Sequence, residues 1–276
     1  IIKRIDVNTV RPPAVAGAFY NGQKQVLAND VQMLLEDARS NIDASELSPK
    51  AIIAPHAGYI YSGPVAASVY ARLTTKRDVI KRVILLGPVH RVPVRGLALP
   101  GVTVFATPLG EIPIDLDAVA AIENMPQVIE STAAHAPEHS LEVQLPFLQT
   151  VLGDFKLLPL AVGNATPSEV AEVLEVLWGG PETLIVISSD LSHFHPYQAA
   201  RTIDAQTAQD ILNLQNTLSH EQACGGTPVN GLLMAARQHH LQPHLLDLRN
   251  SGDTAGDKDR VVGYAAFSFT ETDHAH

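Results

Sequence analysis

Short and almost continuous apolar runs recur along the chain and predict the strands of a sheet. These runs cover residues 51–54, 83–86, 157–162, 184–187 and 261–269. Apolar residues that do not alternate with polar ones are typical of parallel strands that helices cover on both faces. The pattern therefore predicts a buried and mostly parallel sheet.

Amphipathic segments with helical spacing lie between the apolar runs. The clearest begins near Ser168, and the preceding Thr166 together with Glu169 predicts a capping box at its start. Helices are expected over residues 25–39, 64–73, 140–152, 168–178, 199–214 and 229–239. Pro146 should end or kink the third of them, because proline lacks the N–H that a helix interior uses. Strands that alternate with helices predict an α/β fold, a three-layer αβα sandwich on a mostly parallel mixed sheet.

No domain boundary is visible within the 276 residues, because the chain has neither a repeat of fixed period nor a Gly/Ser-rich or charged linker. We therefore expect a single domain over residues 1–276, with residues 1–10 and 270–276 as peripheral ends. The polar tail contains His274 and His276, which are weak metal candidates because chain ends are often frayed.

The net charge and the cysteine content limit which kinds of partner the protein can bind and in which cellular compartment it is expected. A formal net charge of −10 argues against a nucleic-acid partner, because such proteins usually present a concentrated basic face. Basic residues between Lys76 and Arg95 flank an expected strand, and we interpret them as a solvated edge. No apolar stretch is long enough to cross a bilayer, so we expect no membrane insertion. Cys224 is the single cysteine, which excludes an internal disulfide and favours a cytoplasmic location.

Three of the apolar runs are each followed within a few residues by a histidine. His56 follows the first run, His90 the second and His193 the fourth. In open α/β sheets the pocket forms outside the carboxyl ends of the strands, where these side chains would meet. Neutral imidazole is a common metal ligand. The shared placement favours a metal-centred pocket over three isolated loop histidines.

Two further side chains accompany His193. Asp190 lies between the fourth run and His193, and it is expected either to orient a histidine ring or to bind the metal itself. His193 would then be free for proton transfer. His195 precedes Pro196, and we interpret it as a loop residue.

The segment 135–142 has both a structural and a functional interpretation. Glu138 and His139 precede an expected helix, where acidic residues favour the positive end of the helix dipole. They would equally serve as pocket ligands, and both interpretations remain open. For His135 and Glu142 we favour the structural interpretation.

Cys224 and the segment 249–256 also allow two interpretations each. Cys224 is either a small buried hydrophobic residue or a thiolate favoured by the start of the helix that follows it. The polar, glycine-rich segment 249–256 lacks the lysine and the spacing of a phosphate-binding loop. It is either a hairpin turn or part of a pocket rim.

Six motifs in a fixed order carry a resemblance to a known family. They are PHAGY at 55–59, LGPVH at 86–90, EHSLE at 138–142, SSDLSH at 188–193, CGGTP at 224–228 and SGDT at 251–254. Together they resemble the Memo family, whose prokaryotic members are also called AmmeMemoRadiSam system protein B. The likeness extends from Arg11 to Tyr264, nearly the whole chain.

The resemblance implies a fold similar to class III extradiol dioxygenases, the non-haem iron enzymes that cleave catechol rings. It also implies metal ligands at His56, His90 and Cys224. The dioxygenases carry a carboxylate where the Memo family carries the cysteine, and a thiolate is softer and more easily oxidised. Ring cleavage is therefore not carried over to this chain. We expect iron or copper in preference to zinc.

The resemblance assigns His193 and Asp190 to the same pocket, where we expect them to be the catalytic groups. We also expect Tyr59, Glu138 and His139 to line it. The leading hypothesis is a metal-dependent redox or oxygenase-like enzyme that acts on a small molecule. The alternative is a non-catalytic module that holds a peptide or partner in a relic active-site cleft. A zinc-bound water that hydrolyses a substrate would need only the same histidines, a thiolate and a base.

Overall fold

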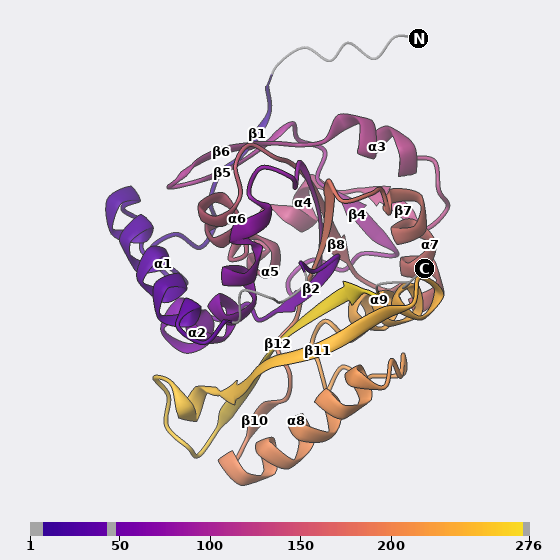
Figure 1. Cartoon of the computed structure of the whole chain (residues 1–276). Coiled ribbons are helices and arrows are strands. Elements are labelled where there is room, and N and C mark those ends of the chain that lie inside the picture. Colours follow the sequence, from indigo (N-terminus) through magenta and orange to yellow (C-terminus); the bar gives the residue numbers. More distant parts are fainter. Residues whose placement is uncertain (1–7, 43–47, 273–276) are drawn as a thin grey trace, which may run out of the picture.

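A sheet of nine strands crosses the middle of the computed structural model, which describes residues 8–42 and 48–272 (Figure 1). The strands, in order across the sheet, are β10 (His193–His195), β12 (Val261–Glu271), β2 (Ala51–Ala54), β9 (Thr183–Ser188), β3 (Arg82–Pro88), β8 (Lys156–Val162), β4 (Leu97–Leu99) and β7 (Val128–Glu130), while β11 (Leu241–Asn250) pairs with β12. The central strands β2, β9, β3 and β8 are parallel, and β12 and β4 join them in the antiparallel sense. The predicted mostly parallel mixed sheet is confirmed.

The apolar runs are continuous because the central strands are buried on both faces. Successive residues of a strand point to opposite faces. Ile52 and Leu85 belong to one buried apolar cluster, whereas Ile53 and Leu86 belong to a second one. All four side chains are at most 1% exposed. Each face of the sheet therefore has its own apolar core.

Helices cover the two faces and complete the three layers. The first core is closed by α1 (Lys24–Arg39), α2 (Tyr59–Tyr70), η1 (Ala71–Lys76), α4 (Thr132–His135), α5 (His139–Glu142) and α6 (Leu145–Val151). The second core is closed by α3 (Leu116–Ile122), α7 (Pro167–Leu177), α8 (Tyr197–Leu212) and α9 (Gly226–Gln238). Figure 1 shows α1 and α2 on one side of the sheet and α7 and α9 on the other. The predicted αβα sandwich is confirmed.

Local signals placed several helix ends correctly. Thr166 and Glu169 form the predicted capping box, with Glu169 N donating to Thr166 Oγ1 at 3.1 Å. The helix expected over 140–152 is broken as predicted, since Pro146 lies in the first turn of α6. The helix expected over 64–73 instead begins at Tyr59, and Pro64 is accommodated inside α2.

Several elements were not predicted. The chain also forms a small sheet of β1 (Val10–Arg11), β5 (Val104–Thr107) and β6 (Gly110–Pro113). Within each of these strands, as within β4, β7 and β10, at most three apolar residues are consecutive, against four in β2. Strand β11 is long but carries polar residues such as Gln242, His244 and Asp247, because it has an exposed side.

Residues close to both ends of the described chain take part in the fold. Arg11 is buried, and Thr270 is paired with Gln242 in the β11–β12 hairpin. Pairing in that hairpin extends β12 into the expected frayed end. Residues 249–256 join the two strands through η2 (Ser251–Asp253), which supports the hairpin interpretation. His274 and His276 lie outside the described residues. Within the described ranges, no helix combines the length and apolar character needed to cross a membrane.

Candidate metal centre

The two candidate histidine ligands are delivered by two strands of the sheet that flank β9. His56 lies two residues beyond the end of β2, and His90 lies two residues beyond the end of β3. Both strands pair in parallel with β9, so their carboxyl ends lie on either side of its end. Cys224 approaches separately, two residues before the start of α9. The sheet register therefore fixes the two imidazoles, and a helix start supplies the thiol.

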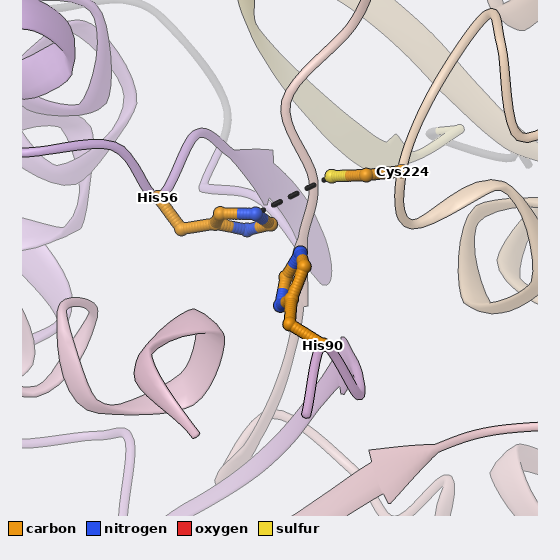
Figure 2. A group of neighbouring side chains, drawn as sticks. All are labelled: His56, His90 and Cys224. Atoms are coloured by element: carbon orange, nitrogen blue, oxygen red, sulfur yellow. Dashed lines mark hydrogen bonds between the residues drawn. The ribbon is translucent and has the colours of Figure 1, made fainter. Parts of the chain in front are cut away.

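The three side chains converge on one point. One ligand atom from each of His56, His90 and Cys224 lies within 4.8 Å of the other two. Figure 2 shows the ring of His56 and a nitrogen of His90 directed at the space in front of the Cys224 sulfur. The Sγ atom of Cys224 lies 3.3 Å from Nε2 of His56. The His56 side chain is 2% exposed and that of His90 is 30% exposed, so the group opens to solvent on the His90 side.

His56 is held by its backbone and by its other ring nitrogen. Its backbone N–H donates to Oδ1 of Asp190 at 2.8 Å, and its Nδ1 lies 2.8 Å from Oγ of Ser188. Burial, reinforced by the neighbouring His139 and His90, lowers the pKa of His56 well below its ordinary value. The ring is therefore neutral at physiological pH, which is the form that binds metals.

His90 is held by the carboxylate of Glu138. Oε2 of Glu138 lies 2.8 Å from Nδ1 of His90, and the same carboxylate accepts from the backbone N–H groups of His90 and Ser140. Burial opposes ionisation of Glu138, but the bonds from His90 and Ser140 outweigh it and lower the pKa of Glu138 to about 2. An ionised carboxylate can only accept, so Nδ1 of His90 carries the proton. Carboxylates commonly orient metal-binding histidines in this way.

Glu138 therefore combines the two roles that the sequence left open. Its side chain caps the start of α5 and also positions His90. The ring of His139 stacks on that of His90 at a centroid distance of 4.4 Å. The atoms of His90, Glu138 and His139 are also close enough to hold an ion. The Glu138 carboxylate already accepts three N–H groups. We therefore interpret Glu138 and His139 as residues that position His90, and not as ligands of a second ion.

A glycine in β3 allows α5 to approach the metal centre. A Cβ atom on Gly87 would lie 2.9 Å from both Oγ of Ser140 and a methyl carbon of Leu141. Such a contact is too short for a real side chain. The absence of a side chain at Gly87 therefore lets Glu138, at the cap of α5, reach His90.

Cys224 is mainly protonated in the absence of a metal. Burial, with a further contribution from Asp190, raises the pKa of the Cys224 thiol to about 12. Of the two interpretations that the sequence left open for Cys224, this pKa favours the buried, protonated thiol in the metal-free protein, because burial outweighs the favourable N–H groups near the start of α9. His56 accepts no proton readily, as its pKa is low. A bound metal would have to displace the thiol proton.

Asp190 lies beside the candidate ligands, and His193 lies within electrostatic range of Asp190 and His56. Asp190 is 4% exposed, its Oδ2 lies 3.7 Å from Nε2 of His56, and its backbone N–H donates to Sγ of Cys224 at 3.4 Å. Burial raises the pKa of Asp190 above its ordinary value. His193, at the start of β10, is half-buried and close enough for its charge to act on both Asp190 and His56.

Comparisons with known proteins identify the family of the chain. The sequence model of the family described as "Memo-like protein" matches residues 11–268. The chain belongs to this family. A MEMO1 family protein of Ignicoccus hospitalis is 35% identical over 283 residues, which cover 94% of this chain and 98% of that protein. A MEMO1 family protein of Aquifex aeolicus is 36% identical over 274 residues, which cover 94% and 99%.

A solved structure was also found. The structure titled "Crystal structure of uncharacterized protein JW3007 from Escherichia coli K12" aligns with a TM-score of 0.49 and 12% identity. The alignment covers 78% of this chain and 98% of that chain.

Other predicted residues of this Memo-like chain have structural contacts. The hydroxyl of Tyr59 donates to the carbonyl of Val143 at 2.6 Å, and its ring packs on Phe147. Tyr59 therefore lies in the packing around the site rather than among the ligand atoms. His135 bonds the carbonyl of Ala98 through Nε2 at 2.7 Å, as its structural interpretation predicted.

Glu142 also has the predicted structural role, with more partners than expected. It forms an ion pair with Arg11 at 2.7 Å, and both side chains are almost fully buried. Glu142 further accepts from Ala14 N, Val15 N and the Tyr20 hydroxyl. These bonds hold the N-terminal segment of the Memo-like fold beside the candidate metal centre, where Phe19 packs on His139 at a centroid distance of 4.7 Å.

Sequence reasoning missed Ser188 and Gln144. Ser188 is the last residue of β9, and Gln144 follows α5. Both are buried and both contact the surroundings of His56. The position of Ser188 at the start of the SSDLSH motif was the available signal. Nothing comparable marked Gln144.

Proposed function

We propose that this Memo-like protein is a metal-dependent redox enzyme, oxygenase-like in its chemistry, in which His56, His90 and Cys224 hold the metal. The observation that carries the proposal is the convergence of these three ligand atoms within 4.8 Å. Each imidazole is anchored through Nδ1, by Ser188 and by Glu138 respectively. That is the support expected around metal-binding histidines.

The donor set fits a first-row transition metal. The 3.3 Å between Sγ of Cys224 and Nε2 of His56 is close to the roughly 3.5 Å that separates sulfur and nitrogen ligands on one tetrahedral ion. Two neutral imidazoles and a thiolate suit iron, copper or zinc. We propose iron or copper, because the oxidisable thiolate fits redox chemistry. When bound, the metal supplies Lewis acidity and electron transfer.

The remaining side chains would position groups and move protons. Glu138 orients His90, and Asp190 holds the backbone of His56. His193 is half-buried and is therefore accessible to a substrate while remaining in the field of Asp190. We assign proton transfer to the ring of His193, with Asp190 as its electrostatic partner.

A catalytic role is favoured over a relic binding cleft by the buried ionisable groups. Asp190 and the Cys224 thiol both have pKa values raised by burial. Such perturbed groups beside an opening are typical of active sites. We propose a small molecule as the substrate, which would approach along the exposed side of His90. Because the thiol ligand must stay reduced, we also propose a cytoplasmic location.

Metal analysis tests the proposal directly. Protein purified anaerobically, without added metal, should contain about one equivalent of iron or copper, as measured by elemental mass spectrometry. The double variant His56→Ala/His90→Ala should lose it, while His220→Ala, which removes an exposed histidine, should keep it. Absence of bound iron, copper and zinc from the wild-type protein, with no binding when they are added, would overturn the proposal. Activity that persists without oxygen would favour hydrolysis over oxygen chemistry.

A further inference from the structure

The hydroxyl of Ser188 has three partners and only one proton. Its Oγ lies 2.6 Å from the carbonyl oxygen of Ser140, 2.9 Å from Nε2 of Gln144 and 2.8 Å from Nδ1 of His56. A carbonyl oxygen can only accept, so the Ser188 proton points to Ser140. Oγ must then accept from the other two partners. Nδ1 of His56 is therefore the donor, and its Nε2 carries the lone pair.

The amide of Gln144 keeps the Ser188 hydroxyl in this orientation. Nε2 of Gln144 donates to the carbonyl of Pro55 at 3.0 Å as well as to Ser188. The reversed amide would place its oxygen against the carbonyl oxygen of Pro55, with no proton between them. The Tyr70 hydroxyl in turn donates to Oε1 of Gln144 at 2.5 Å. Each of these side chains is at most 1% exposed, so water cannot replace their bonds at low cost.

We propose that Ser188, oriented by Gln144, is a positioning residue that fixes His56 as the Nδ1–H tautomer and so aims its Nε2 lone pair at the metal position. This lone pair lies 3.3 Å from Sγ of Cys224, within reach of the thiol proton in the metal-free protein. His90 reaches the same tautomer through an ionised carboxylate. The two imidazoles therefore present equivalent nitrogen atoms, one supported by a neutral hydroxyl and the other by an anion.

Two readouts test this inference, and only the second rests on the proposed metal site. Long-range ¹H–¹⁵N correlation spectra of metal-free protein labelled at histidine report which ring nitrogen of His56 carries the proton. His56→Asn assigns the signal. We expect Nδ1–H in the wild-type protein and a mixture of tautomers in Ser188→Ala. In metal titrations, Ser188→Ala should bind about 10- to 100-fold more weakly.

Two variants separate positioning from packing. Thr207→Val removes another fully buried hydroxyl, which bonds the carbonyl of Ile203 within α8, and it should leave both readouts unchanged. Tyr70→Phe should keep the Nδ1–H tautomer, because Pro55 and Ser140 already determine the direction of the network.

An Nε2–H proton on His56 in the wild-type protein overturns the inference, even if Ser188→Ala does not fold. So does a Ser188→Ala protein whose tautomer and metal affinity match those of Thr207→Val. A wild-type protein that binds no metal but shows Nδ1–H would refute the metal-dependent function and support the tautomer assignment.

Discussion

The carboxylate of Glu138 lies 2.8 Å from Nδ1 of His90, and this contact joins the cap of a short helix to a candidate metal ligand. Because Glu138 is 1% exposed and also accepts from two backbone N–H groups, the ring of His90 is oriented before any metal arrives. Hydrogen bonds thus connect the start of α5 to the candidate metal centre, so a change at one of them should alter the other.

Replacing Glu138 should therefore weaken metal binding without removing a ligand. Glu138→Gln keeps the size of the side chain but loses the anion that accepts from His90. We expect the metal affinity to fall about 10- to 100-fold, as for other residues that orient metal-binding histidines. Titration with the metal measures the change, with the exposed Glu123→Gln as the matched control. Equal affinities in the two variants would contradict the role of Glu138.

The depressed pKa of Glu138 should also appear in the pH dependence of stability. Its folded-state pKa of about 2 lies below the ordinary value of 4.5, so its contribution is complete above pH 4.5 and is lost as the pH falls towards 2. The shift corresponds to about 3 kcal/mol of unfolding free energy, as an order of magnitude. Urea unfolding of wild type and Glu138→Gln between pH 7 and 2.5 should show the gap between them shrinking with acid. A constant gap would contradict the depressed pKa.

Uptake of metal should release a proton from Cys224. Because the pKa of the thiol is about 12 in the metal-free protein, binding at pH 7 must deprotonate it, and the affinity should rise up to tenfold per pH unit between pH 6 and 8. Calorimetry in buffers of different ionisation enthalpy measures the proton count. Cys224→Ala, which has no proton to lose, should show weaker binding and a shallower pH dependence. The same slope in both proteins would show that another group is the source.

The buried pair of Arg11 and Glu142 should be costly to break. Arg11→Met leaves Glu142 without its charged partner, and loss of one member of a buried pair typically costs about 3–5 kcal/mol. Arg11→Met combined with Glu142→Gln should recover part of the loss, because no unpaired charge remains. Chemical denaturation of the single and double variants measures the coupling. Additive effects would indicate that the pair contributes through packing alone.

The close approach of α5 to β3 predicts a strong effect at one glycine. Gly87→Ala places a methyl group 2.9 Å from Ser140 and Leu141, and overpacking of this kind costs about 1–3 kcal/mol. It should also weaken metal binding, because Glu138 moves with α5. Gly153→Ala, whose new methyl would meet nothing closer than 3.4 Å, is the control. Equal stability of the two variants would show that α5 can shift freely.

Much of the fold could be predicted because parallel strands buried on both faces have a distinctive apolar pattern. The apolar run at 184–187 corresponds to β9. Thr166 precedes the start of α7 and Pro146 lies in the first turn of α6, as the sequence signals predicted. The polar β11 and the short strands were missed, since the exposed side of β11 carries polar residues and the short strands contain few consecutive apolar residues.

The candidate site was predictable to a similar extent. His56 and His90 could be placed together because parallel strands end at the same edge of a sheet. The protonation state of Cys224 could not, because it depends on burial and on the distance to Asp190. The roles of Ser188 and Gln144 could not be predicted either, because they follow from the donors and acceptors around the Ser188 hydroxyl, which only the structure shows.

The separate delivery of the third ligand has an evolutionary consequence. The two imidazoles follow strands that flank β9 in the sheet, whereas Cys224 lies on the loop before α9. A mutation of that one loop residue can exchange sulfur for oxygen as the third donor without disturbing the strands. Proteins that share this fold can therefore change the metal they prefer, and its reactivity, by one substitution. The two nitrogen ligands stay the same.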